Sequence, residues 1–417
     1  MRIALVSLHT DPFDPPGWGD AGGMNVVVRH HARQLAEAGH EVEVLTRRAD
    51  PDAPELREAG DGLRLRLVDA GPPRPLAKSE QGVLTEAFGE ALLRLEPFEL
   101  VHAHHWMSGV AALPAARAWD VPLLMSYHSI AAPPGSPLAD GEPPEDALRV
   151  AGEARMAREA ELLVTVSEAE ARTAIERCGA DPARVRVLPP GVDTELFRPL
   201  EPAPPCPGDD IGYAFLAARL QPLKGIDVAI DAIGLLPAGL RPRLVIAGED
   251  SIDFAGYRAE LEQRAARLHE EAERAAGGPV PPPVSFIGAQ ERERLALWLR
   301  EARLVLAPSY SETFGLVAIE AAASGVPTVA AADAGGLAEA VVDGVSGVLV
   351  PGWDPAEWAE HIELLLRDSD RRCAMRKAAR AHAERFAWPL VGRRLLDIYE
   401  EALRAERGSR VATGEPA

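Results

Sequence analysis

Two carboxylates in the stretch SYSETFGLVAIEAAASGVPTVAA (309–331) stand eight positions apart around a Phe-Gly pair. Glu312 falls in the loop after the apolar run LVLAP, whereas Glu320 falls one to two turns into a helix that is expected to begin near Gly315. Both side chains are therefore expected to face the same cleft. The N–H groups of Gly315 and Leu316 have no partner inside such a helix, so they are suited to bind a diphosphate.

A second pair of charged residues lies in ARLQPLKG (218–225), where Arg219 ends an expected strand and Lys224 lies in the following loop. Two fixed cations beside a helix N-terminus can neutralise a departing diphosphate without a metal ion. Isolated residues of this type are more often solvated surface charges, but their place at the carboxyl end of a strand favours a binding role. We therefore predict an anion site here.

A glycine-rich stretch, GWGDAGGMNVVV (17–28), follows the apolar opening MRIALVSLHTD. Glycine at a strand-to-helix turn lets a ligand approach the backbone N–H groups of the helix N-terminus. The spacing is not G-x-G-x-x-G, so the dinucleotide fingerprint is missing. The residues alone leave two interpretations open, a tight turn that needs positive φ and a ligand-binding loop.

Composition narrows the class of protein. The 417 residues include 44 basic and 64 acidic side chains, and the net charge of −20 opposes binding to nucleic acid or to anionic lipid. Cys178, Cys206 and Cys373 lie far apart without metal-ligand spacing, which predicts reduced thiols and a cytoplasmic protein. Neither a signal-peptide core nor a membrane-spanning apolar stretch is recognisable.

Short apolar runs alternate with longer amphipathic ones, as in IALVSL (3–8), VVVRHHARQLAEAG (26–39) and VEVLT (42–46). This alternation predicts an α/β protein with parallel sheets covered by helices on both faces. Two doubly wound, Rossmann-like domains should face each other across a ligand-binding cleft. The expected parts are an N-terminal domain at 1–190, a Pro-rich linker at 191–210, a C-terminal domain at 211–385, a terminal helix at 386–405 that packs back on the N-terminal domain, and a frayed tail at 406–417.

Three segments carry a resemblance to a known family: the E-x7-E segment ETFGLVAIE, the R-x4-K segment RLQPLK and the ending FAWPLVGRRLLDIYEEAL. They are similar to retaining glycosyltransferases of the GT-B fold, in glycosyltransferase family 4. This large group includes sucrose-phosphate synthase and many mannosyltransferases. The likeness runs from Met1 to about Ala405, and the stretches SLHTDPFD, GDAGGMNV and VVDGVSGVLV most resemble the subfamily that glycosylates D-inositol 3-phosphate in mycothiol synthesis.

The resemblance implies a UDP-sugar donor. Counterparts of Arg219 and Lys224 hold the diphosphate, that of Glu320 binds the ribose and that of Glu312 contacts the donor sugar. His128, at the end of VPLLMSYH, matches the position that touches the transferred sugar, although a structural histidine at a strand end is the alternative. The expected donor-binding residues are Gly23, Arg219, Lys224, Glu312, Phe314, Gly315, Leu316 and Glu320. The expected catalytic residues are Glu312, His128, Arg219 and Lys224.

For the acceptor, the family pattern places His9, Asp20 and Asn25 around inositol hydroxyl groups. It places Lys78 and Arg155 at the acceptor phosphate, although a solvated loop residue is the alternative for Lys78. The sequence departs from the family where a Tyr and a Thr are expected at the phosphate, because it has His105 and Ser129 there. Both can still donate a hydrogen bond, so phosphate binding is feasible, but the departures leave the acceptor open.

The implied reaction moves a sugar, N-acetylglucosamine or a hexose, to a hydroxyl of a small phosphorylated acceptor with retention. No carboxylate can be assigned to the face opposite the leaving group, so the leaving diphosphate is expected to draw the proton itself. On that interpretation Glu312 orients the sugar, and domain closure assembles the site. No metal or other cofactor is expected to be required, with magnesium and a homodimer left open.

Three other functions differ in the residues that they require. A retaining transferase with another acceptor, such as fructose 6-phosphate or a lipid-linked mannoside, would keep the donor residues and differ only around the acceptor. A dehydrogenase would also use a doubly wound domain, but the missing G-x-G-x-x-G loop opposes it. A non-catalytic binding protein would be expected to lose Glu312, Arg219 or Lys224, and all three are present.

Overall fold

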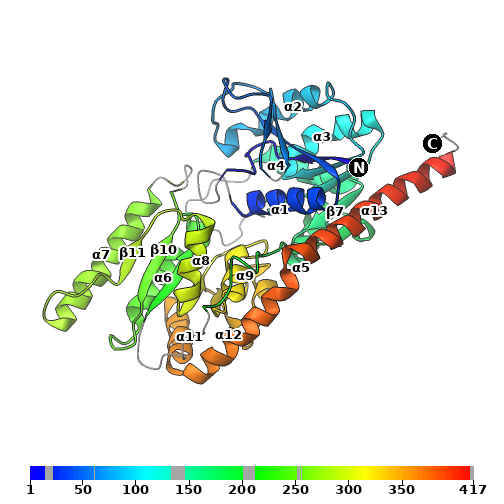
Figure 1. The fold of residues 1–417 in the computed structure, drawn as a ribbon. Helices are drawn as coiled ribbons and strands as arrows, with labels where there is room; N and C mark the ends of the chain where they lie inside the picture. The colour runs from blue at the N-terminus through cyan, green and yellow to red at the C-terminus, as the bar shows by residue number, and fades with distance from the viewer. Residues whose placement is uncertain are drawn as a thin grey trace.

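The computed structural model describes residues 1–14, 22–60, 62–132, 146–200, 212–250, 254 and 256–413, with side chains up to residue 406. Two units are visible, each with a central sheet and helices packed on its two faces (Figure 1). The α/β class with two Rossmann-like domains is confirmed.

The first sheet has the strand order β3-β4-β2-β1-β5-β6-β7-β8. All neighbours pair in parallel except β3, which runs antiparallel to β4 at the edge and departs from the expected all-parallel sheet. Its strands are β1 (Arg2–Val6), β2 (Glu41–Arg47), β3 (Leu56–Glu58), β4 (Arg64–Val68), β5 (Leu100–His104), β6 (Leu123–Ser126), β7 (Leu162–Thr165) and β8 (Val185–Val187). The order reverses between β1 and β5, which is where open α/β sheets bind ligands.

The second sheet is parallel throughout, in the order β11-β10-β9-β12-β13-β14, and it reverses between β9 and β12. Its strands are β9 (Tyr213–Ala217), β10 (Arg243–Ala247), β11 (Val284–Phe286), β12 (Leu304–Ala307), β13 (Thr328–Ala331) and β14 (Gly347–Val350). Their inner residues are nearly all apolar and buried, because helices cover both faces.

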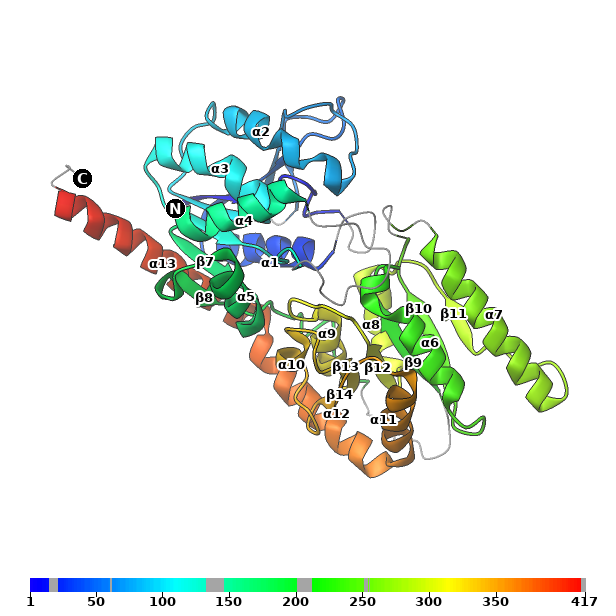
Figure 2. The ribbon, with the colours of Figure 1, turned by 180° about the vertical axis from the view of Figure 1, so that it is seen from behind.

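Helices cover both sheets, as the two opposite views show (Figures 1 and 2). The helices of the first unit are α1 (Gly23–Glu37), α2 (Thr85–Leu92), α3 (Trp106–Trp119), α4 (Ala147–Glu159) and α5 (Glu168–Cys178). Those that follow are α6 (Ile226–Leu235), α7 (Tyr257–Ala276), α8 (Arg292–Glu301), α9 (Leu316–Ala323), α10 (Leu337–Ala340), α11 (Pro355–Arg367), α12 (Ser369–Ala383) and α13 (Trp388–Thr413). Short 3-10 turns include η1 (Lys78–Glu80) and η4 (Pro222–Lys224).

The C-terminal helix α13 leaves the second unit and packs along α1 of the first (Figure 2). Its first residue, Trp388, stacks on His30 with ring centroids 4.4 Å apart, and Tyr399 is fully buried against the first sheet. The helix continues to Thr413, beyond the Ala405 at which the sequence predicts that it ends.

The two units also touch through Glu339 of α10. Its carboxylate accepts hydrogen bonds from the backbone N–H groups of Glu168 and Ala169, at 2.9 Å each, at the start of α5. Those N–H groups have no partner within their own helix, so the carboxylate from the second unit caps a helix of the first.

The structure shows the bonding state of two of the three cysteines. Cys178 is buried and free, but Cys373 is disulfide-bonded, so the prediction that all three thiols are reduced is wrong. Separation along the chain does not tell which thiols meet in space.

Among the described residues, no helix has both the length and the apolar character needed to cross a membrane.

Candidate functional site

A cavity of about 410 Å³ lies between the two units, at the carboxyl ends of their strands. Its walls come from the α1 N-terminus, the β5–α3 and β6–α4 connections, and the loops after β9 and β12. Fourteen of the sixteen residues predicted to act line this cavity, namely His9, Gly23, Asn25, Lys78, His105, His128, Ser129, Arg219, Lys224, Glu312, Phe314, Gly315, Leu316 and Glu320.

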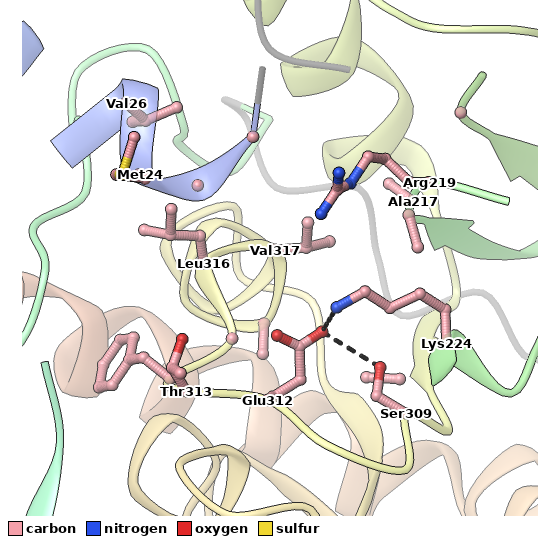
Figure 3. Close-up of a pocket in the computed structure, with 18 of the residues that line it drawn as sticks. Met24, Val26, Ala217, Arg219, Lys224, Ser309, Glu312, Thr313, Leu316 and Val317 are labelled. Atoms are coloured by element: carbon pink, nitrogen blue, oxygen red, sulfur yellow. Dashed lines mark hydrogen bonds and ion pairs between the residues drawn. The ribbon is translucent and has the colours of Figure 1, made fainter. Parts of the chain in front are cut away.

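Glu312 is held in place by the loop that carries it. Its backbone N–H donates to Ala334 and its carbonyl accepts from Gly336, both at 2.9 Å. A Cβ on Gly336 would lie 2.0 Å from the carbonyl oxygen of Thr313, so only glycine allows the two loops to pack this closely. The Glu312 carboxylate accepts from Lys224 Nζ at 2.6 Å and from Ser309 Oγ at 3.1 Å (Figure 3).

Arg219 and Lys224 follow β9 and point toward the same cavity (Figure 3). Lys224 ends the turn η4, and Gly225 then takes φ of 59° to start α6. A Cβ on Gly225 would lie 2.1 Å from the carbonyl oxygen of Pro308, so the turn packs directly against the loop that leads to Glu312. This backbone contact brings Lys224 and Glu312 together.

The N-terminus of α9 faces the same space. Gly315 precedes the helix with φ of 101°, and neither its N–H nor that of Leu316 meets a protein acceptor within the described residues. Free N–H groups and the helix dipole favour an anion at this point. Gly23, at the start of α1, lies across the cavity, where an added Cβ would come 3.0 Å from the side chain of Leu316.

Glu320 lies one turn further along α9 and is 2% exposed. Burial raises the pKa of its carboxyl group, and Arg292 of α8 opposes the rise by donating to Oε1 at 2.5 Å. Arg292 also stacks over the ring of Phe197, 4.7 Å from its centroid. Arg292 is not among the residues predicted from the sequence, because nothing in its local pattern indicates that α8 packs beside α9.

Histidines form the wall on the side of the first unit. Burial lowers the pKa of His128 to about 3, so its ring is neutral at physiological pH. His128 adopts φ of 60°, a conformation that is costly for a side chain with a Cβ, and its Nε2 lies 2.9 Å from Nδ1 of His104. Such strain is often found at functional sites.

A cluster of cations lies beside these histidines. His105 begins α3 with φ of 74°, and its ring lies 4.5 Å from that of His9. Burial, helped by the charge of Lys78, holds the pKa of both histidines well below 6.5. Arg149 of α4 pairs with the buried Glu153 at 2.8 Å and also donates to Ser129 Oγ at 3.2 Å, and its charge acts on both rings.

Arg155 is not brought to this cluster. It lies six positions after Arg149 in α4, which turns it by about 120° around the helix. Its side chain is 40% exposed and pairs with Glu159 instead. Arg149, which is not among the predicted residues, lies beside Ser129 instead. The position of each arginine around the helix relative to Ser129 is the signal that separates them.

Asp20 and Asn25 are two further residues that the sequence predicts to bind the acceptor. Asp20 lies outside the described residues. Asn25 lines the cavity, but its side chain accepts from the N–H of Gly22 at 3.1 Å and donates to Thr10 Oγ1 and the Asp11 carbonyl at 3.0 and 2.7 Å. Its amide thus holds the turn before α1.

Comparison with known proteins agrees with this geometry. Residues 22–191 match the model of a glycosyl transferase 4-like domain, and residues 208–382 match that of glycosyl transferases group 1. The chain is 40% identical to the D-inositol 3-phosphate glycosyltransferase of Acidothermus cellulolyticus, over 97% of this chain and 91% of that protein. It is 40% identical to the protein of the same name from Nocardia farcinica, over 99% and 92%.

Two solved structures superpose on nearly the whole of this chain. Sucrose-phosphate synthase from Thermosynechococcus elongatus superposes with a TM-score of 0.82 at 27% identity, covering 97% of this chain and 99% of that one. The HepE protein of Anabaena, in complex with UDP and glucose, superposes with a TM-score of 0.74 at 20% identity, covering 96% and 100%. The second likeness concerns the fold alone.

Fold and site together define an enzyme that transfers sugars and has the GT-B fold. The chain belongs to glycosyltransferase family 4, as its resemblance in sequence implies, and shares about 40% identity with D-inositol 3-phosphate glycosyltransferases along nearly its whole length.

Proposed function

We propose that this protein is a retaining glycosyltransferase that moves a sugar from a UDP-sugar to a hydroxyl of a small phosphorylated acceptor such as inositol phosphate. One observation carries the proposal: a single cavity has two separate cationic regions, one on each domain. Arg219 and Lys224 line the first, and Lys78 lines the second, with Arg149 next to it at Ser129. Residues 1–190 would bind the acceptor and residues 211–385 the donor.

The donor is assigned to the second domain. A diphosphate would lie between Arg219, Lys224 and the N–H groups of Gly315 and Leu316, where opposite charge and free donors coincide. Glu320 would accept from the ribose hydroxyl groups. The uracil base is supported by the solved HepE complexes, which contain UDP or UDP-glucose. Either N-acetylglucosamine or a hexose is proposed as the transferred sugar.

The acceptor is assigned to the first domain. Phosphate binding requires positive charge in a partly dehydrated place, and Lys78, Arg149 and the hydroxyl of Ser129 supply charge and hydrogen bonds there. His9 and His105 are neutral when the site is empty, so each retains a lone pair and one N–H for sugar or phosphate oxygens. The names of the inositol phosphate relatives support this choice.

The reaction forms a bond from the acceptor oxygen to the anomeric carbon and breaks the bond from that carbon to the diphosphate. The leaving diphosphate takes the acceptor proton on the same face, so configuration is retained. Arg219, Lys224 and the α9 N-terminus stabilise the charge that develops on the phosphates. Glu312 and His128 position the sugar, and closure of the domains around both substrates excludes water.

The rival acceptors are fructose 6-phosphate and lipid-linked mannosides, and the likeness to sucrose-phosphate synthase favours the first of these. The test is a screen of UDP- and GDP-sugars against inositol phosphate, free inositol, fructose 6-phosphate and simple alcohols. Nucleotide release and product mass are measured. Product with inositol phosphate and a UDP-sugar is expected; product only with fructose 6-phosphate would establish the rival, and product with free inositol at equal rate would refute the phosphate site.

A further inference from the structure

Three buried imidazoles gather outside the cavity described above. His31 lies on α1, and His102 and His104 lie two residues apart on β5, so they share one face of the first sheet. Helix α1 packs over that face. One ligand atom from each ring lies within 4.8 Å of the others, and the residues are 3%, 0% and 0% exposed.

Several nitrogens of this cluster have no partner. Both ring nitrogens of His31 and Nε2 of His104 are buried without a hydrogen bond in the described part of the chain. Leaving a polar atom buried and unbonded is costly, so native proteins usually place a partner, a water molecule or an ion beside it.

Hydrogen bonding orients the other rings. Ser126 Oγ donates to the Val164 carbonyl at 2.7 Å, so it accepts from His102 Nε2 at 3.0 Å, and the lone pair of His102 is on Nδ1. That lone pair accepts from the hydroxyl of Tyr399 at 2.8 Å.

His104 is oriented by a different partner, since its Nδ1 faces His128 Nε2 at 2.9 Å. With Nδ1 as the donor, the lone pair of His104 is on Nε2, the nitrogen that has no partner. Metal-binding histidines are typically held in this way, by a hydrogen bond from the nitrogen that does not bind the metal.

We propose that His31, His102 and His104 bind one zinc ion, or a similar transition-metal dication, in the core of the first domain. The ligand atoms are one ring nitrogen of His31, Nδ1 of His102 and Nε2 of His104. The fourth position is left for a water molecule, and the ion displaces the hydrogen bond that the hydroxyl of Tyr399 donates to His102. Neutral imidazoles suit zinc.

To bind a zinc ion, the three histidine rings must move closer together. Ligand atoms about 2.1 Å from a tetrahedral zinc ion lie about 3.4 Å from one another, so the rings must move inward from their present spacing. Since the three ligands come from α1 and β5, the ion ties this helix to the sheet. The site is structural, because none of its ligands lines the cavity that we assign to the substrates.

The test measures bound metal. The full chain is produced with added zinc sulfate, dialysed against metal-free buffer and analysed for metal by mass spectrometry. One zinc ion per chain is expected for the unaltered protein, and a large loss for His31→Gln and His102→Gln. His269→Gln is the control, because this partly exposed histidine on α7 lies in the other domain. Zinc at the same level in all variants, or in none of them, would overturn the proposal.

A second measurement covers variants that fail to fold. The unaltered protein is loaded with Co²⁺ in place of zinc, and its visible spectrum is recorded. The intense ligand-field absorption of a four-coordinate site is expected, together with a melting temperature that rises with added zinc. A folded protein that shows neither would refute the site. Sugar transfer does not enter either measurement, so this test stands apart from that of the proposed function.

Discussion

The ammonium group of Lys224 lies 2.6 Å from the carboxylate of Glu312, although 88 positions separate the two residues. In the empty cavity each neutralises the other. In the donor complex that we propose, Lys224 turns to the diphosphate oxygens, and Glu312 is then free to accept from sugar hydroxyl groups. The pair thus keeps two charges in a partly buried place without leaving either unpaired.

Lys224→Ala is expected to lower kcat by about 100-fold to 1000-fold and to weaken donor binding, because a preorganised charge at the leaving group is lost. Steady-state kinetics with a UDP-sugar measure the first effect and calorimetry the second. Lys377→Ala is the matched control, since this lysine is exposed on α12. Near-normal turnover of Lys224→Ala would contradict the donor site.

Arg149→Ala is expected to raise KM for the phosphorylated acceptor by about 10-fold to 100-fold, the effect of losing a hydrogen bond to a charged group. kcat should change less, because Arg149 is far from the breaking bond in this assignment. Arg155→Ala, in the same helix, should leave KM near its normal value. A larger rise in KM for Arg155→Ala than for Arg149→Ala would restore the assignment that the sequence suggested.

Gly336→Ala is expected to destabilise the fold by about 1–3 kcal/mol, because the new Cβ would meet the backbone of Thr313 at 2.0 Å and force the Glu312 loop to move. The affinity of this variant for the UDP-sugar should fall as well. Urea unfolding and calorimetry provide the two measurements. Gly278→Ala serves as the comparison, because no atom lies within 4 Å of its added Cβ; equal stability of the two variants would refute the packing argument.

Glu170 predicts a pH dependence. Burial raises the pKa of its carboxyl group from 4.5 to about 7, so the folded state favours the protonated form. Its contribution to stability is therefore fully present below pH 4.5 and is lost as pH rises through 7, by up to about 3 kcal/mol at 1.36 kcal/mol per pKa unit.

Glu170→Gln should remove that loss, because the amide cannot ionise. Urea unfolding at pH 5 and pH 8 should show that the variant gains stability relative to the unaltered protein at the higher pH. Glu176→Gln, on the exposed side of the same helix, should follow the unaltered protein. Parallel behaviour of Glu170→Gln and the unaltered protein would show that Glu170 is already ionised in the folded state.

The sequence by itself determined the α/β class and brought together the residues to which we assign the donor. Alternating apolar and amphipathic runs define strands and helices through local periodicity, and a strand followed by a helix sends its loop to one edge of the sheet. Arg219, Lys224, Glu312 and Glu320 lie in two such loops and the helix after one of them. Local spacing was therefore enough to place them together.

The tertiary structure decided what depends on packing between distant segments. Arg149 and Arg155 share one helix, and only its packing shows that Arg149 is the one beside Ser129, a residue that lines the cavity. The pairing of Glu320 with Arg292, the antiparallel strand β3 and the meeting of His31 with His102 and His104 likewise join segments far apart in the chain. Local periodicity sets which face of an element is buried, but the neighbour that meets this face depends on how the elements pack in three dimensions.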